Sequence, residues 1–321
     1  MTRYAFRRIL QAVPLILGAS VATWILIHVA PGDPIVALAG EDGNAEYYKR
    51  MRERFGLDEP LHEQLWIYLG DLAQGDLGFS FRQNRPATDV ILGQIPATLL
   101  LVIPALALAV VIGVVLGAVA ASHRGSMTDG LLRAVTLLGH SMPVFWLAQL
   151  LLLLFAVRFD WFPVQGRYDI RANHSGLRGV LDQAHHMVLP VTALAAVYLP
   201  PIMRVTRAAM AEALEAPYIV AARARGQSRR RALFRHALPN ATLPVVTVIG
   251  SQLGFMIAGA VLVETVFAWP GMGRLLLGAM LNRDYALITA TLLLVAIAVI
   301  LVNLVTDLLY AALDPRVRHE P

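Results

Sequence analysis

Long apolar runs recur along the chain and are separated by polar segments. Six of them are close to the ~20 residues that a helix needs to cross about 30 Å of hydrocarbon at about 1.5 Å per residue. The predicted spans are residues 9–29, 97–121, 134–157, 187–208, 242–263 and 286–310. The first run resembles a signal peptide but is too long and lacks an A-x-A cleavage site, so we expect it to stay as a helix. The pattern predicts an all-α membrane protein with six transmembrane helices.

The polar segments orient these spans. Residues 204–235 hold eight arginines and two glutamates, which places them on the cytoplasmic side by the positive-inside rule. An even number of spans then puts both termini in the cytoplasm. The loop 158–186 would then lie outside with four arginines against three acids, which fits the positive-inside rule least well. Long loops can cross regardless of charge.

The same reasoning divides the chain into three parts. Residues 1–30 are a cytoplasmic N-terminus and the first transmembrane helix, and residues 97–321 are a five-helix transmembrane core with a cytoplasmic loop at 204–241. Residues 31–96 hold eleven acids against six basic residues, so we expect an extracytoplasmic cap. The cap is either structural or a docking surface for a soluble binding protein, and the sequence leaves both open.

Composition narrows the function. Hydrophobic residues make up 57% of the chain and charged residues 15%, against about 25% charged in soluble domains. The absence of cysteine excludes disulfides and thiolate metal sites, and the arginines lie at span ends, which favours membrane lipid over nucleic acid. No G-x-S-x-G or H-E-x-x-H motif is present, so we predict no catalytic residues and no metal.

If this protein transports a solute actively, the energy must come from a separate protein. The spans hold almost no ionisable groups away from their ends, which disfavours ion coupling. The only lysine, Lys49, lies outside any phosphate-binding loop, so this chain has no Walker A motif. We therefore expect no cofactor on this chain, and ATP and Mg²⁺ on a separate ATPase that binds the loop 204–241.

The loop has a pattern suited to such contact. A short helix carries small residues and an aromatic at three- or four-residue spacing, namely Tyr218, Ala221, Ala222 and Arg225. Gly226 permits the positive φ that reverses the chain, and Ser228 caps a second, arginine-rich helix. Those arginines suit acids on an ATPase or anionic lipid equally well.

Motifs along the chain now point to a family. Val220-Ala221-Ala222, Gly226 and Leu238-Pro239 are similar to the E-A-A, glycine and I-x-L-P pattern of transporter permeases, with Val220 replacing the glutamate and His236 the isoleucine. Further likenesses are Pro31-Gly32-Asp33-Pro34, Gly75-Asp76-Leu77-Gly78-Phe79-Ser80, Ser141-Met142-Pro143-Val144-Phe145-Trp146, Phe267-Ala268-Trp269-Pro270-Gly271-Met272-Gly273-Arg274 and Arg283-Asp284-Tyr285. The chain resembles the permease subunits of bacterial ABC importers, in the dipeptide, oligopeptide and nickel branch.

The resemblance implies a type I ABC importer permease fold in the bacterial inner membrane. It implies four kinds of partner: a second homologous permease, two ATP-binding subunits, an extracytoplasmic substrate-binding protein and membrane lipid. Together the permeases would conduct peptides inward, with nickel chelates and glutathione-like solutes left open. A membrane scaffold or receptor that docks a cytoplasmic protein through 204–241 is the alternative from another class.

Within the spans, two kinds of residue stand out. Ser251 and Gln252 place polar groups in mid-span, where an amide needs a partner, so they are candidates for the translocation path. The pairs Gly113 and Gly117, and Gly250 and Gly254, have G-x-x-x-G spacing, which predicts close helix packing.

Overall fold

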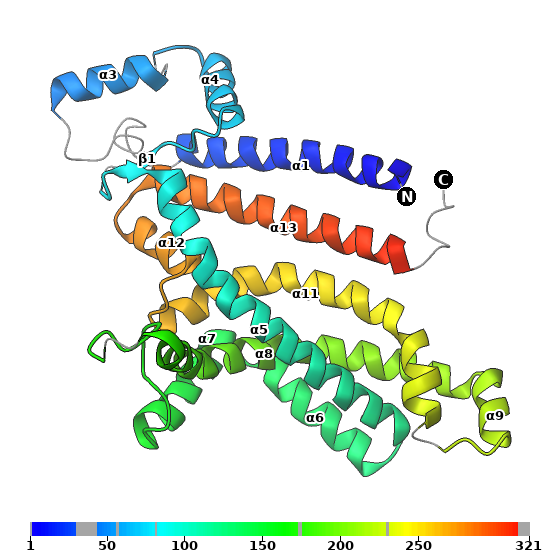
Figure 1. Ribbon diagram of the computed structural model, residues 1–321. Coiled ribbons are helices and arrows are strands. Elements are labelled where there is room, and N and C mark those ends of the chain that lie inside the picture. The colour runs from blue at the N-terminus through cyan, green and yellow to red at the C-terminus, as the bar shows by residue number, and fades with distance from the viewer. Residues whose placement is uncertain are drawn as a thin grey trace.

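The computed structural model describes residues 2–29, 44–55, 58–80, 82–172, 175–228 and 231–313. Figure 1 shows a bundle of long helices with small elements at both ends. The elements are α1 (Thr2–Val29), α3 (Ala45–Phe55), α4 (Leu61–Ala73), β1 (Phe79–Ser80), β2 (Arg85–Pro86), α5 (Ala87–Ser122), α6 (Met127–Ser141), α7 (Val144–Leu151), the π-helix η1 (Leu152–Arg158), α8 (Gly176–Glu215), α9 (Pro217–Ala224), the π-helix η2 (Ala232–Ala237), α11 (Leu238–Val266), α12 (Met272–Leu281) and α13 (Tyr285–Leu313). The predicted all-α class is confirmed, since β1 and β2 form only a two-residue antiparallel pair.

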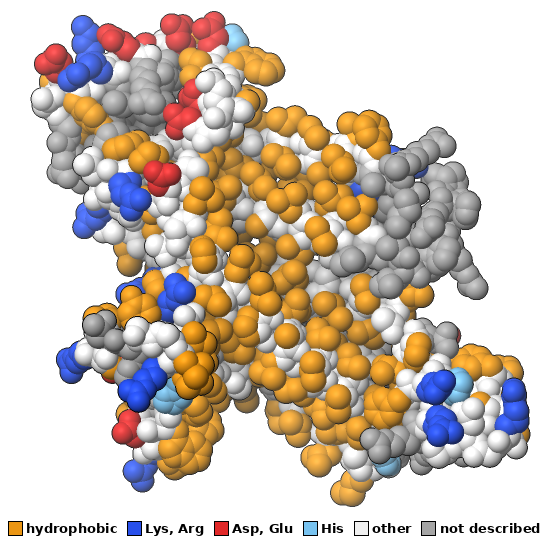
Figure 2. Space-filling model, viewed as in Figure 1, with side chains coloured by type: hydrophobic (Ala, Val, Ile, Leu, Met, Phe, Trp, Pro, Cys, Tyr) orange, Lys and Arg blue, Asp and Glu red, His pale blue; other side chains and the backbone are white. Residues whose placement is uncertain are grey.

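Five helices within the described ranges are long and apolar enough to cross a membrane: Phe6–Leu26, Ala87–Ser122, Gly176–Glu215, Ala241–Val266 and Tyr285–Leu308. Hydrophobic side chains cover the middle of the face in Figure 2, and charged side chains gather toward its ends. This distribution is typical of a multi-pass membrane protein, because lipid tails accept apolar side chains and reject charges.

The third predicted span, 134–157, is wrong as a single straight helix. Met127–Ser141 and Val144–Arg158 meet at an angle of 101°. Pro143 causes the break, because a proline disfavours helical geometry in the residue before it. Met142 is accordingly extended, with φ −85° and ψ 133°.

Two helices begin well before the predicted spans. Helix α5 begins at Ala87 rather than 97, and α8 runs from Gly176 to Glu215 rather than 187–208. The extra turns of α5 are held by packing, since Val90 and Ile91 are buried in a cluster that includes residues of α12 and α13. Helix α12 was not among the predicted elements, because ten residues are too few for a span.

Close glycine contacts hold the bundle together. A Cβ atom added to Gly117 of α5 would lie 2.7 Å from the Met203 carbonyl oxygen of α8, and one on Gly113 would lie 3.0 Å from Ile202 Cγ2. Gly250 of α11 likewise packs directly on Thr306 of α13, whereas a Cβ on Gly254 would make only ordinary contact with α13. The predicted packing role is confirmed for Gly113, Gly117 and Gly250, whereas Gly254 has room for a Cβ atom.

A buried carboxylate fixes the far end of α11. Glu264 is fully buried and accepts hydrogen bonds from Thr98 Oγ1 of α5 at 2.6 Å and from the Gly273 amide of α12 at 2.7 Å. A carboxylate at a helix N-terminus satisfies free amides and matches the helix dipole. Trp269 adds a hydrogen bond from Nε1 to the Ala97 carbonyl at 2.8 Å. The loop between α11 and α12 is therefore fastened to α5.

The smaller elements attach near the same end. Helix α4 contacts α1 through Tyr68, whose hydroxyl lies 2.9 Å from Thr23 Oγ1, and through Gln64, which lies 3.1 Å from His28 Nε2. Ser80 of β1 donates to Asp284, just before α13, at 2.5 Å. The expected cap at 31–96 thus includes α3, α4, the hairpin and the first turns of α5, while residues 31–43 lie outside the described residues.

Candidate functional site

The loop predicted at 204–241 is largely helical. Helix α8 continues to Glu215, and after the single residue Ala216 a new helix, α9, begins at Pro217. Pro217 explains the break, since Ala216 before it is extended, with φ −68° and ψ 145°. Figure 1 shows α9 projecting from one end of the bundle. The eight-residue length of α9 agrees with the short helix that the sequence predicts here.

The end of α9 follows the sequence prediction closely. Gly226 has φ +82°, in the left-handed region that favours glycine. The Gln227 amide donates to the Ala222 carbonyl at 3.3 Å, the bond that closes a Schellman motif. His236 Nε2 lies 2.7 Å from Gln227 Oε1 and so fastens the turn to η2. Gly226 therefore has the turn-forming role that was predicted for it.

Helix α9 has two distinct faces. Ile219 and Ala222 are buried, with Ile219 in a cluster that includes Met210 of α8 and Leu233 of η2. Tyr218 is 44% exposed and Val220 60% exposed. The side chain of Ala222 points into this chain, while its contact with an ATPase stays a prediction. Tyr218 and Arg225 are exposed, and Ala221 lies at the margin between the two faces.

The Leu238-Pro239 pair begins α11. Leu238 packs against the cluster that contains Ile219, and Pro239 is exposed in the first turn of the helix. Proline has no amide hydrogen for the helical bond to the residue four positions back. The π-helical turn η2 directly precedes it, as expected where the regular ladder is interrupted. Ser228 Oγ accepts from the Arg231 amide at 3.3 Å, which confirms the predicted cap, while Arg229 and Arg230 lie outside the described residues.

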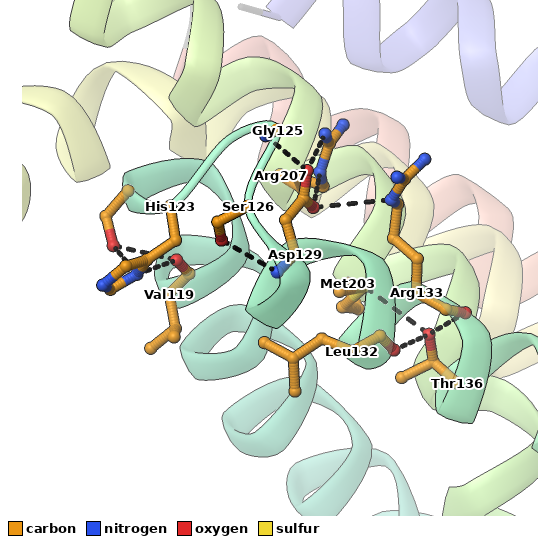
Figure 3. Close-up of polar contacts among 11 residues, drawn as sticks. Val119, His123, Gly125, Ser126, Asp129, Leu132, Arg133, Thr136, Met203 and Arg207 are labelled. Atoms are coloured by element: carbon orange, nitrogen blue, oxygen red, sulfur yellow. Dashed lines mark hydrogen bonds and ion pairs between the residues drawn. The ribbon is translucent and has the colours of Figure 1, made fainter.

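Figure 3 shows a buried ion pair near this end of the bundle that sequence reasoning missed. Asp129 of α6 is fully buried, and Arg207 of α8 donates from Nε and Nη2 to its two carboxylate oxygens, each at 2.6 Å. The Gly125 amide donates to the same carboxylate at 3.1 Å, and Arg133 Nε lies 3.4 Å away. A fork of two parallel bonds fixes the relative orientation of α6 and α8.

A second ion pair lies at the base of α9. Arg124 Nη1 contacts Glu215 Oε1 at 2.5 Å, and both side chains are largely exposed. Glu215 is the last residue of α8, so the turn between α5 and α6 is tied to the end of the helix that carries α9.

The sequence carries only a local signal at Asp129. Ser126 and Asp129 have the spacing of a capping box, which indicates where α6 begins. Nothing in the sequence pairs Asp129 with a residue 78 positions away.

The structure separates the two candidates for the translocation path. Ser251 is exposed and lines a groove of about 420 Å³ between α1, α11 and α13, together with Gln11 and Asn303. Gln252 is half-buried and does not line this groove. Adjacent residues on a helix point in different directions, so a shared role would need two different surfaces.

Two family models cover nearly the whole chain. One is described as the binding-protein-dependent transport system inner membrane component and matches residues 113–319, and an N-terminal model for the same kind of transport system matches residues 1–102. The chain belongs to this permease family. The permease is therefore a multi-pass inner-membrane protein and a subunit of an ABC importer, as the sequence motifs predicted.

Curated relatives place the permease in the peptide and nickel branch. It is 40% identical over 335 residues to the di/tripeptide transport system permease protein DppB of Pseudomonas aeruginosa (strain UCBPP-PA14). It is 38% identical over 338 residues to the dipeptide transport system permease protein DppB of Escherichia coli (strain K12), and 37% identical over 320 residues to the glutathione transport system permease protein GsiC of the same strain. Each match covers 100% of both chains.

A solved structure shows the same fold. A chain from inward-facing conformations of the MetNI methionine ABC transporter matches the permease with a TM-score of 0.55 and 18% identity, over 71% of this chain and 97% of that chain. The predicted type I ABC importer permease fold is confirmed.

Proposed function

We propose that this permease forms half of the translocation path of an ATP-driven importer for dipeptides or oligopeptides. The full-length similarity to relatives named for di/tripeptide and dipeptide transport supports the substrate class. In this proposal two separate ATP-binding subunits hydrolyse ATP with Mg²⁺, and the chain itself is not catalytic. A second homologous permease and an extracytoplasmic substrate-binding protein complete the importer.

One observation carries the coupling role: α9 presents an exposed face while its other face is packed into the bundle. Tyr218 and Arg225 lie on the exposed side, and Ile219 is buried against α8 and η2. A partner that moves α9 must then move these helices as well, because close-packed elements transmit displacement. We assign Tyr218, Ala221 and Arg225 to the ATPase contact, and Ala222, Gly226, Leu238 and Pro239 to holding the shape of this segment.

The displacement has a defined route into the spans. Glu215 at the base of α9 is paired with Arg124, and Arg207 two turns earlier in α8 is paired with Asp129 of α6. The first pair joins the α5–α6 turn to the end of α8, and the second joins the first turn of α6 to α8. In our proposal the ATPase therefore moves α8 and the third span together.

The proposed orientation follows from charge. We place both termini and residues 204–241 in the cytoplasm, and the cap of α3, α4 and the hairpin on the extracytoplasmic side, where it contributes to docking of the binding protein. The arginine excess near α9 supports this orientation. Of the two pathway candidates we keep Ser251, which is exposed in the groove between α1, α11 and α13.

Reconstitution tests this function. Proteoliposomes with the permease, its second permease and two ATPases should accumulate a dipeptide when ATP and a loaded binding protein are supplied. Tyr218→Ala with Arg225→Ala should reduce uptake at least tenfold. Tyr168→Ala with Arg171→Ala is the matched control, because these residues are also exposed but lie in the loop before α8. If the parent assembly shows no ATP-dependent uptake of dipeptides or oligopeptides, the proposed substrate class is wrong.

The relative named for glutathione transport favours a second solute. Uptake of labelled glutathione and of labelled dipeptide should be compared in separate reactions with the same proteoliposomes. Uptake of glutathione without uptake of dipeptide would move the substrate assignment to glutathione-like solutes.

A further inference from the structure

A groove of about 240 Å³ lies between α6 and α8, next to the buried ion pair. Its lining residues are Arg133, Thr136, Leu137 and His140 from α6, and Pro200, Pro201, Met203, Arg204 and Arg207 from α8. None of these residues belongs to the proposed ATPase contact on α9 or to the groove that holds Ser251.

Positive charge in this groove is not neutralised within the described part of the chain. Both oxygens of Asp129 are occupied by Arg207. Arg133 reaches the same carboxylate only at 3.4 Å, and its side chain is 58% exposed. Arg204 is exposed and makes no hydrogen bond or ion pair with any described residue. The three arginines of the groove are therefore offset by the one carboxylate of Asp129, which leaves a net charge of two positive units for an external anion.

The other end of the groove is apolar and has its polar groups satisfied. Pro201 cannot donate to the Val197 carbonyl, and His140 Nδ1 lies 3.1 Å from that oxygen and donates to it instead. Thr136 Oγ1 donates to the Leu132 carbonyl at 2.8 Å. Leu137, 62% exposed, and the two prolines form the remaining surface at this end.

We propose that this groove binds the phosphate of an anionic phospholipid, with Arg133 and Arg204 on the phosphate and the apolar end against the glycerol and acyl chains. The order of groups along the antiparallel helices supports a lipid over a fully soluble anion. Arg133 and Arg207 lie toward the α5–α6 turn, where the spans end, and Leu137 and Pro200 lie deeper. Basic pockets between helices at a membrane surface have this chemistry.

Such a lipid would connect the same two helices, α6 and α8, that the ion pair connects. A phosphate held by Arg133 of α6 and Arg204 of α8 bridges the two helices that Asp129 and Arg207 already join. It would strengthen the contact between α6 and α8, through which the proposed displacement from α9 passes. The inference rests on the permease lying in the membrane, which its family shows, and lipid binding can be measured without transport.

The test is native mass spectrometry of the assembled importer purified from mixed micelles of phosphatidylglycerol and phosphatidylcholine. The parent should retain phosphatidylglycerol preferentially. Arg133→Gln with Arg204→Gln should weaken that retention roughly 30-fold, since each arginine near a membrane surface contributes about a factor of five. Arg171→Gln with Arg178→Gln removes the same charge from exposed residues outside the groove and should retain the lipid.

Two further measurements separate the possible outcomes. Arg133→Lys with Arg204→Lys keeps the charge and should restore most of the retention, which shows that a loss in the Gln variant is not misfolding. Inorganic phosphate and a dipeptide are each added as competitors. Equal lipid retention by parent and Gln variant, or complete displacement of the lipid by either competitor, would overturn the lipid assignment.

Discussion

Replacing Arg207 by Gln tests whether the buried ion pair fastens α6 to α8. The change removes both 2.6 Å bonds to Asp129, whose side chain is 1% exposed. Removing one partner of a buried pair typically costs about 3–5 kcal/mol, because the remaining charge stays away from water. Arg133 at 3.4 Å offers partial compensation, so we expect a loss near 3 kcal/mol, at the low end of that range.

The exposed pair of Arg124 and Glu215 provides a matched control in the same region. Arg124 and Glu215 connect the same elements but are 58% and 71% exposed, so Arg124→Gln should cost under about 1 kcal/mol. The double variant Asp129→Asn with Arg207→Gln should recover part of the loss, because neither charge is then buried alone.

The assay is SDS-titrated unfolding of the purified permease in mixed micelles, followed by tryptophan fluorescence, with ATP hydrolysis and uptake measured in proteoliposomes. Arg207→Gln should also lower the uptake achieved per ATP hydrolysed, since the proposed route crosses this pair. Equal unfolding free energies for Arg207→Gln and Arg124→Gln would refute the argument that burial makes this pair structural.

Three further outcomes are expected. Gly117→Ala should destabilise the permease by about 1–3 kcal/mol in the same unfolding assay, since its Cβ would lie 2.7 Å from the Met203 carbonyl oxygen, while Gly130→Ala, with nothing within 4 Å, should be neutral or stabilising. A cysteine at Ser228 should resist an impermeant external reagent in intact cells, and its labelling would reverse the proposed orientation. Deleting residues 58–73 should lower the stimulation of ATP hydrolysis by the binding protein, and unchanged stimulation in an assembled complex would remove the cap from docking.

Much of the fold follows from local chemistry that a sequence displays. Apolar length locates the spans, and Gly226 and Ser228 have the turn and cap roles that their side chains suit. The bend after α6 could also have been predicted from the sequence, because Pro143 disfavours helical geometry at Met142. We predicted a straight span because the apolar run continues through the break.

The features that the sequence could not supply depend on contacts between distant segments. Ala222 fits the spacing of an exposed stripe, but the packing of α9 on α8 and η2 decides which side is covered, and Ala222 is buried. The pairing of Asp129 with Arg207 spans 78 positions and has no local signature. Helix α12 depends on Glu264, a carboxylate from another helix, to complete its first turn.

The break between α6 and α7 has a mechanical consequence. Helix α6 is 15 residues long, or about 22 Å, and it ends at a bend of 101° where Met142 is extended. Helix α7 packs against α8 and α11 beyond that bend. A tilt of α6 by about 10° about this bend would displace its Asp129 end by about 4 Å, and α8, which Arg207 ties to Asp129, would have to move with it. The proline thus replaces one continuous helix by two that meet at an angle, and both of them pack against α8.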